Sequence, residues 1–424
     1  MSGLGGTDTS ATGINNRGVV TGTAWTLNNA VYHPFVYHNG STLELMPLGE
    51  SAYAGATDIN MERYVAGRTD GSGLDARATL WTPEGKPVDM GNLGGSMTTA
   101  AEINNLLQAV GYGETAEGDT HAFMWMRGDM TDLGTLSGDH SKAYSLNNNG
   151  ITVGLSWLEG NFVFAACYWE DGVIHELPGL GGEFSRAFGV NDHNQIVGYA
   201  RPQYGNRTPV VWQQRWIRRL RYPNSSGAEA HGINNNGVII GSMEKGSWSE
   251  YSTEIVWPSP DYMAVSVYKL LPPNSRWGYI ANLSDINDLN QIVGSGNYGP
   301  NDDVFNRHAF LLTPVYPSFD LTQFSPGISG QMSTIEAHNV PPGATVHFLG
   351  ARWGGGALIP TCEVTKNALQ LEDPRQLGTA VADEGGVAVI EGLIPDEWAG
   401  REILFQAFIR DSCEISNLVV QTFE

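Results

Sequence analysis

Short apolar segments alternate with turns rich in Gly and Asn along most of the chain. The segments are brief and β-branched or aromatic, as in Val19-Val20 and Ile239-Ile240. Within 121–125 the side chains alternate with a period of two, so that Ala122 faces one way and Phe123 the other. This pattern predicts β-strands joined by tight turns rather than helices.

One marker recurs at a nearly constant spacing. An apolar residue followed by Asn occurs seven times, and a Gly stands seven positions after each Asn. The seven Asn residues are Asn15, Asn60, Asn104, Asn147, Asn191, Asn234 and Asn287. Subtracting successive Asn numbers gives spacings of 45, 44, 43, 44, 43 and 53 residues. A period near 43 to 45 residues is that of a four-stranded propeller blade, so the pattern predicts seven blades.

Each repeat divides into four predicted strands, A to D. Strand A is rich in small residues, as in 99–104, which suits the innermost position beside a narrow axis. An Asn-Asn-x-Gly turn leads to the β-branched strand B, because Asn and Gly accept left-handed backbone conformations. Strand C carries aromatic rings that we expect to fill the space between blades. No strand D precedes Leu4, so the seventh blade takes one from about 313–321 or closes with three strands.

The pattern changes after Leu312. Short alternating segments such as 343–348 and 402–408 are separated by turn signals every 8 to 12 residues, which is typical of an antiparallel sandwich. The predicted fold class is therefore all-β. A seven-bladed β-propeller is expected over residues 1–315, followed by an Ig-like β-sandwich over residues 316–424.

The composition excludes some classes of function. A net charge of −22 and a pI near 4.7 disfavour nucleic-acid binding. No apolar run reaches 18 residues, so no membrane span is expected. Met1-Ser2-Gly3 does not begin a signal peptide, and we expect an export signal either to have been removed or never to have been present.

Two of the three cysteines lie in the C-terminal quarter. Cys362 and Cys413 are both flanked by strand-like sequence and are predicted to form a disulfide in an oxidising compartment. Cys167 stands where sister repeats carry Phe123 or Phe310, and we interpret it as a buried apolar residue.

The repeats resemble the HAF repeat family of predicted extracellular bacterial proteins, named after the His-Ala-Phe of strand C. The resemblance rests on residues 121–125, 130–136 and 143–147, and it extends over roughly residues 4 to 312. The His is replaced in several units, at Arg77, Ala165, Thr208 and Thr253. The resemblance implies a propeller that is secreted or displayed on the cell surface, and no settled activity comes with it.

The B–C loops are the candidate binding surface, because they vary in length on a constant scaffold. They carry aromatic residues just after the Gly that ends strand B. These are Trp25, Tyr112, Trp157, Tyr199, Tyr204, Trp248, Tyr251 and Tyr298. Such side chains bind a glycan or an extracellular protein partner, or they pack against neighbouring loops, and the sequence leaves both interpretations open.

No catalytic motif or cofactor site is evident. Asp302 and Asp303 are weak metal candidates, because they lack a regular Asp-x-Asp-x-Asp-Gly spacing. We expect the histidines of strand C, such as His33 and His121, to form structural hydrogen bonds. A binding or structural module is thus favoured. One alternative is a subunit of an extracellular assembly joined through the C-terminal domain. The other is a polysaccharide hydrolase or lyase, which needs convergent carboxylates or a Tyr/His pair inside the channel.

Overall fold

The computed structural model describes residues 1, 3–71, 75–213, 216–223, 225–244, 252–272, 274–299, 307–314, 318–355, 357 and 369–424. The elements in these ranges are β-strands and three short 3-10 helices, which confirms the all-β prediction. The chain forms two compact units. The first comprises Met1–Val267 with Tyr279–Leu311, and the second comprises Tyr268–Gly278 with Leu312–Glu424.

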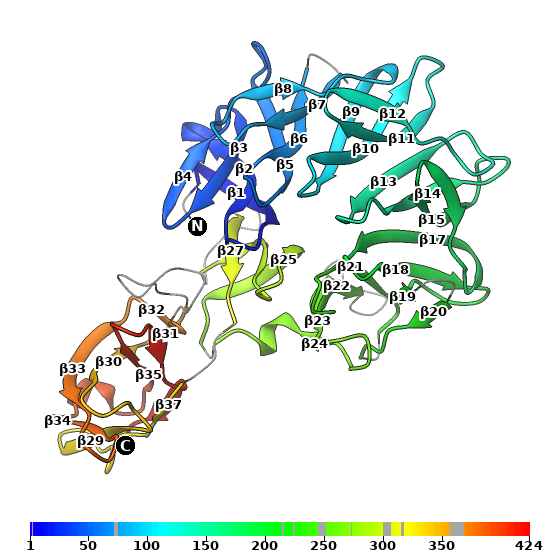
Figure 1. Ribbon diagram of the computed structural model, residues 1–424. Helices are drawn as coiled ribbons and strands as arrows, with labels where there is room; N and C mark the ends of the chain where they lie inside the picture. Colours follow the sequence, from blue (N-terminus) through cyan, green and yellow to red (C-terminus); the bar gives the residue numbers. More distant parts are fainter. Residues whose placement is uncertain are drawn as a thin grey trace. The chain divides into compact units, whose positions relative to one another are not determined.

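The first unit contains the seven repeats (Figure 1). In the first six, strands A to D pair in chain order, and the seventh has strands A to C among its described residues. Strands A are β1 (Gly5–Ile14), β5 (Tyr53–Ile59), β9 (Gly94–Ile103), β13 (Ser141–Leu146), β17 (Gly181–Val190), β21 (Ala228–Ile233) and β25 (Trp277–Ile286). Strands B are β2 (Val20–Thr26), β6 (Val65–Asp70), β10 (Gln108–Thr115), β14 (Thr152–Trp157), β18 (Gln195–Pro202), β22 (Ile239–Glu244) and β26 (Ile292–Tyr298).

The outer strands complete each sheet. Strands C are β3 (Tyr32–His38), β7 (Ala76–Trp81), β11 (Thr120–Met126), β15 (Phe164–Glu170), β19 (Thr208–Gln213), β23 (Ser252–Trp257) and β27 (His308–Leu312). Strands D are β4 (Ser41–Glu44), β8 (Pro87–Asp89), β12 (Asp129–Asp132), β16 (Val173–Glu176), β20 (Trp216–Arg219) and β24 (Val265–Ser266). The 3-10 helices are η1 (Leu27–Asn29), η2 (Val267–Lys269) and η3 (Asp396–Trp398).

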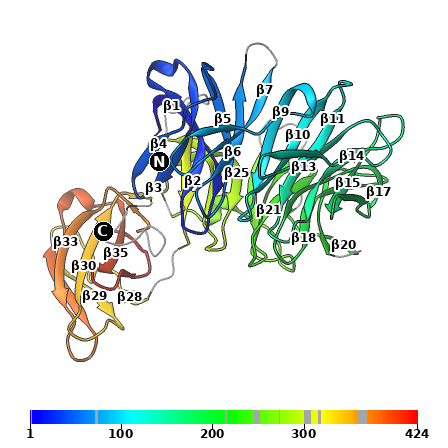
Figure 2. The ribbon, with the colours of Figure 1, turned by 45° about the horizontal axis from the view of Figure 1, so that its top comes forward.

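A closed ring of hydrogen bonds joins the seven repeats. The side-chain Nδ2 of each marker Asn donates to the backbone carbonyl of the marker Asn in the next repeat, over 2.8 to 3.1 Å. The last bond runs from Asn287 back to Asn15 at 2.9 Å. The repeats therefore surround an axis, as the ribbon of this unit shows in Figures 1 and 2, and a linear stack is excluded.

Each ring Asn also holds its own A–B turn. In the fourth repeat, Asn147 Oδ1 accepts the backbone N–H groups of Asn149 and Ile151, each at 3.0 Å. The same two bonds recur in all seven turns, and the seven Asn residues are only 3 to 6% exposed. The sequence predicted this locking of the turn, but it did not reveal the bond to the next repeat.

A second tier of bonds lies one residue after the ring Asn. Here a backbone N–H donates to the side-chain oxygen of the equivalent residue in the next repeat, as in Asn105 to Asn148 at 3.0 Å. Six such bonds are present, over 2.7 to 3.0 Å. The seventh would run from Asn16 to residue 61, where Met has no amide oxygen.

Completing this tier is expected to stabilise the first unit. Met61→Asn supplies an acceptor for the Asn16 N–H, and we expect it to raise the free energy of unfolding by about 0.5–1 kcal/mol. Urea titration followed by tryptophan fluorescence measures the change. Met61→Leu, which adds no acceptor, is the matched control, and equal stability of the two variants would contradict the prediction.

Tryptophans at the end of strand C join adjacent sheets. Trp81, Trp169, Trp212 and Trp257 are at most 1% exposed. Their Nε1 atoms donate to backbone carbonyls just after strand D of the preceding sheet, over 2.7 to 2.9 Å. This arrangement agrees with the expectation that strand C rings fill the space between blades. Trp125 occupies the same position in the third repeat, but its buried Nε1 has no acceptor.

This difference gives a matched pair of variants. Trp169→Phe removes the bond to the Leu133 carbonyl, and we expect it to lower the free energy of unfolding by about 2 kcal/mol. Trp125→Phe removes a donor that is already unpaired, so its cost is expected to be at least 1 kcal/mol smaller. Chemical denaturation of both variants measures the difference. A larger cost for Trp125→Phe would show that the indole bond is not the source of the stabilisation.

Strand C also carries the histidine that the sequence singled out. His33 Nδ1 lies 2.6 Å from Glu44 Oε1, and His121 Nδ1 lies 2.7 Å from Asp132 Oδ2. In both cases the carboxylate is on strand D, so the pair holds C to D. Arg77 stands at the His position of the second repeat and bonds Asp89 in the same way, at 2.6 Å. The predicted structural hydrogen bond is thus present, and a guanidinium replaces the imidazole in one repeat.

The seventh sheet has three strands among its described residues, in the order β25-β26-β27. The suggestion that its strand D reaches residue 321 is wrong, because β28 (Asp320–Leu321) pairs with β29 (Met332–His338) of the second unit. The Met1 amine donates to the Ala309 carbonyl at 3.1 Å. In the third sheet the N–H of Leu133 donates to the equivalent Ala122 carbonyl, so Met1 takes the place of the residue that follows strand D.

The second unit contains two larger antiparallel sheets. One has the order β28-β29-β34, with β34 at Ala388–Leu393. The other has the order β33 (Arg375–Val381), β30 (Thr345–Ala351), β35 (Glu402–Ile409) and β36 (Glu414–Ile415), and β37 (Val419–Thr422) also pairs with β35. A separate pair is formed by β31 (Trp353–Gly354) and β32 (Leu371–Glu372). One apolar cluster includes Ile335 of the first sheet and Phe405 of the second.

Two further features belong to this unit. Tyr268–Gly278, which the sequence assigned to the repeats, groups with it, because Asn274 bonds Glu402 and Arg276 bonds Glu372 at 3.2 Å. Cys413 is disulfide-bonded. Its predicted partner, Cys362, lies outside the described residues, so the pairing stays a prediction.

Candidate functional site

A cavity of ≈ 300 Å³ lies where the seven A strands approach the Asn turns. All seven repeats contribute to its lining, with the ring Asn, the residue on either side of it, and the positions two and three residues before it, except that Gly13 of the first repeat is not in the lining. The volume is at the lower end of the range for small-ligand sites. Its character depends on the positions two and three residues before each ring Asn, because these differ from repeat to repeat.

A β-bulge turns both positions toward the cavity. In β1, Ala11 pairs with Gly22 and Gly13 pairs with Thr21, so that Thr12 is an extra residue without a partner. The same irregularity recurs in the first six repeats. A bulge interrupts the alternation of a strand and redirects side chains. Two consecutive residues of each such strand therefore line the cavity, where a regular strand would present one.

Three carboxylates gather at the position two residues before the ring Asn. They are Asp58, Glu102 and Asp285, of the second, third and seventh repeats. The other four repeats carry Gly13, Ser145, Gly189 and Gly232 at this position. Because Gly and Ser suffice there, the fold does not require a carboxylate. The acidic side chains occupy one arc of the ring, on either side of the first repeat.

The environment keeps these carboxyl groups protonated to a higher pH than usual. Burial raises the pKa of Asp58 to about 6 and that of Asp285 to about 7, the latter with a contribution from the Asp58 charge. Burial and the nearby Asp58 raise the pKa of Glu102 well above its ordinary value. Hydrogen bonds from backbone N–H groups, such as Ile14 to Asp285 at 2.8 Å and Ile103 to Asp58 at 3.0 Å, act in the opposite direction.

The opposite arc is aromatic. Tyr144, Phe188 and His231 occupy the position three residues before the ring Asn in the fourth, fifth and sixth repeats. The Tyr144 and Phe188 rings are 5.7 Å apart and tilted, and Phe188 and His231 are 5.7 Å apart and edge-on. The cavity thus joins hydrogen-bonding carboxyl groups on one side to a continuous wall of ring faces and edges on the other.

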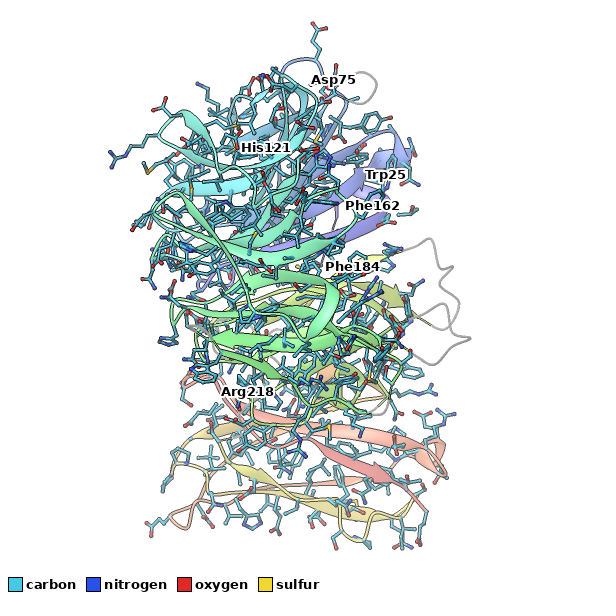
Figure 3. All side chains as sticks on the ribbon, turned by 90° about the vertical axis from the view of Figure 1, so that its right-hand side faces the viewer. Trp25, Asp75, His121, Phe162, Phe184 and Arg218 are labelled. Atoms are coloured by element: carbon cyan, nitrogen blue, oxygen red, sulfur yellow. The ribbon has the colours of Figure 1, made fainter. Side chains whose placement is uncertain are left out.

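The aromatic residues predicted on the B–C loops lie elsewhere, and most contact neighbouring side chains. Trp25 packs edge-on against Tyr32 at 5.5 Å, and Trp157 packs against His140 and Phe164 at 5.6 and 5.7 Å. In Figure 3, Trp25 lies toward the same side of the unit as Phe162 and Phe184.

Of the remaining predicted aromatic residues that the structure describes, three are packed or buried and one is exposed. Tyr112 lies under the Lys142 ammonium, Tyr298 meets His308, and Tyr199 is only 4% exposed. Tyr204, in contrast, is 87% exposed. Trp248, Tyr251, Asp302 and Asp303 lie outside the described residues. These contacts accord with packing between loops, and the rim as a ligand surface stays a prediction.

The described residues contain no group of three or more His, Cys, Asp or Glu side chains placed to hold a metal ion. Within the same part of the chain, no helix is long and apolar enough to cross a membrane.

The cavity residues were not identified from the sequence, although a signal was present. Aligning the seven repeats on the ring Asn shows a position that alternates among Gly, Ser, Asp and Glu within an otherwise uniform strand. Small residues were expected along the whole axis. They occupy the position four residues before the ring Asn, with Ala in six repeats and Leu283 in the seventh, whereas the cavity-lining positions after it carry aromatic and acidic side chains in several repeats.

Comparison with known proteins gives similarity of structure alone. No family model matches the chain, and no curated protein matches it. Among solved structures, the β-propeller domain of the Trilobed protease from Pyrococcus furiosus is similar at 11% identity and a TM-score of 0.47, covering 72% of this chain and 95% of that one. Hydrazine synthase from Kuenenia stuttgartiensis is similar at 9% identity and a TM-score of 0.35, covering 99% and 68%.

Proposed function

We propose that the protein is a secreted or cell-surface glycan-binding module, with a seven-bladed β-propeller of HAF-type repeats and a C-terminal β-sandwich. The ring from Asn15 through Asn287 back to Asn15 supports seven blades. An apolar cluster shared by Ile335 and Phe405 of facing sheets supports the sandwich. The resemblance of the repeats to predicted extracellular proteins supports export.

The observation that carries the glycan proposal is the division of the cavity into two arcs. Saccharides offer hydroxyl groups, which carboxylates bind well, and apolar ring faces, which stack on aromatic side chains. Asp58, Glu102 and Asp285 supply the first kind of contact, and Tyr144 and Phe188 supply the second. The cavity volume suits one or two sugar rings, so the ligand is expected to enter by an end of its chain.

A glycan array followed by isothermal titration calorimetry tests this function. For a ligand found on the array, we expect Phe188→Ala and Asp58→Asn each to weaken binding at least tenfold. Trp25→Ala and Trp157→Ala, on the B–C side, are expected to change it less than twofold. The opposite result would place the site on the rim loops. No binding to any glycan would reject the proposal.

Hydrolysis of the bound glycan is a second candidate function. It is favoured by the pKa values of Asp58 and Asp285, raised to about 6 and about 7, because a general acid must hold its proton near neutral pH. Incubating ligand with the wild type and with Asp285→Asn, and measuring new reducing ends, tests it. Turnover by the wild type alone would establish hydrolysis, and no release by either protein leaves a binding module.

A further inference from the structure

Two basic side chains stand at one position in consecutive repeats. Lys142 and Arg186 lie five residues before the ring Asn of the fourth and fifth repeats, and two residues before Tyr144 and Phe188. Alternation along β13 and β17 places Lys142 on the strand face of Tyr144 and Arg186 on that of Phe188, with the intervening Ala143 and Ala187 fully buried. Tyr144 and Phe188 line the cavity, and the two cations lie next to this wall rather than in the lining itself. The same position elsewhere holds Ser10, Gly55, Thr99, Glu229 and Asn282. The fold therefore does not require a cation there.

Arg186 is held against the aromatic wall. Its guanidinium carbon lies 5.7 Å from the Tyr144 ring centre and 5.4 Å from those of Phe164 and Phe188. Its Nε is buried and has no hydrogen-bond acceptor. Among the described residues, no carboxylate lies within ion-pair distance of Arg186, whereas the neighbouring Arg207 is paired with Glu229.

Lys142 has no described ion-pair partner either. Its ammonium lies over the Tyr112 ring, 4.4 Å from the centre. Burial lowers the pKa of Lys142, and the Arg186 charge lowers it further. Lys142 and Arg186 repel each other, and no described carboxylate pairs with either, although the chain has a net charge of −22. Cations with a purely structural role are normally paired with a carboxylate when they are buried.

We propose that Lys142 and Arg186 bind an anionic group, a carboxylate or a sulfate ester, on a saccharide whose ring lies against Tyr144 and Phe188 in the cavity. The terminal Nη groups of the Arg186 guanidinium can donate to the oxygens of such a group. The sugar ring that carries the anion would then lie beside Tyr144 and Phe188, which Arg186 already contacts. This inference rests on the proposed glycan function and makes its ligand an acidic saccharide.

Calorimetric titration with three oligosaccharides of equal length tests the proposal. One carries uronic acids, one is sulfated, and one is neutral. We expect at least one acidic form to bind the wild type ten times more tightly than the neutral form. Arg186→Gln is expected to reduce this preference to twofold or less, with neutral binding unchanged. Lys142→Gln is expected to reduce it about threefold, and it serves as the second variant if Arg186→Gln folds poorly.

The control is Arg218→Gln. Arg218 pairs with the exposed Asp261, and Figure 3 shows it apart from Phe184, on the other side of the unit. This variant alters net charge by the same amount and is expected to keep the full preference.

Equal binding of acidic and neutral forms by the wild type would overturn the inference and leave the glycan function in place. An undiminished preference in Arg186→Gln and Lys142→Gln would overturn it as well. The absence of all binding would reject both. Tighter binding of the uronate or of the sulfated form identifies the source of the anion.

Discussion

Asn147→Ala is expected to lower the free energy of unfolding by about 3–5 kcal/mol, because it removes four hydrogen bonds from a buried site, one of them the 2.7 Å bond from Nδ2 to Asn194 Oδ1. The Oδ1 atom accepts the N–H groups of Asn149 and Ile151, and Nδ2 donates to the Asn191 carbonyl at 2.9 Å. Alanine leaves two donors without partners and opens one junction of the ring. Urea titration with tryptophan fluorescence measures the loss.

Two further variants identify which hydrogen bonds account for the stability lost in Asn147→Ala. Asn105→Ala removes an exposed amide from the second tier, with its single bond to the Met61 N–H, and is expected to cost less than 1 kcal/mol. Asn147→Asp keeps both acceptor bonds but lacks the donor to Asn191, so its stability should lie between those of wild type and Asn147→Ala. A cost for Asn147→Ala within 1 kcal/mol of that for Asn105→Ala would refute a stabilising ring.

Stability is expected to fall as the pH rises from about 4 to 7. The pKa values of Asp58 and Asp285 are raised to about 6 and about 7, and burial also raises that of Glu254 to about 7. The folded protein therefore binds more protons than the unfolded chain between about pH 4 and pH 7. In that window the free energy of unfolding decreases with rising pH, and above it the decrease levels off.

Asp58→Asn isolates the contribution of the cavity carboxyl groups to this pH dependence of stability. The amide oxygen can still accept the Ile103 N–H, but no charge forms beside Glu102 and Asp285. At pH 8 we expect the variant to be about 1–2 kcal/mol more stable than wild type, since water screens the half-buried group. At pH 3, where the carboxyl group is protonated in both the folded and the unfolded chain, the two should be nearly equal. Glu117→Gln, an exposed substitution with the same charge change, should shift stability little at either pH. A variant less stable than wild type at pH 8 would contradict the prediction.

The sequence was sufficient for the elements that repeat. Every turn needs an Asn whose short amide accepts two backbone N–H groups, so Asn147 and its six equivalents mark the period directly. The end of strand C was equally plain, because Trp169 and its equivalents must fill the space between sheets. These features were predictable because one local physical requirement acts seven times.

The candidate site depends on departures from the repeat, and it was not found. Strict alternation along strand A would place Asp58 and Glu102 away from the side that Thr57 and Ala101 face. The bulge brings both positions to the cavity, and a single sequence gives no sign of an extra unpaired residue. The aromatic residues of the B–C loops were conspicuous in the sequence, yet Trp25 packs against Tyr32 and Trp157 packs against Phe164.

The ring of Asn side chains holds the repeats together, and other positions distinguish one repeat from the next. Each junction uses the same Asn side chain and backbone atoms, whichever residue stands two, three or five places earlier. The residue two places before the ring Asn can therefore differ from repeat to repeat, as Gly13, Ser145 and Asp285 illustrate, while the Asn hydrogen bonds that close the ring are kept. Related chains are therefore expected to share the ring of Asn side chains and to differ in the residues that line the cavity, and with them in ligand preference.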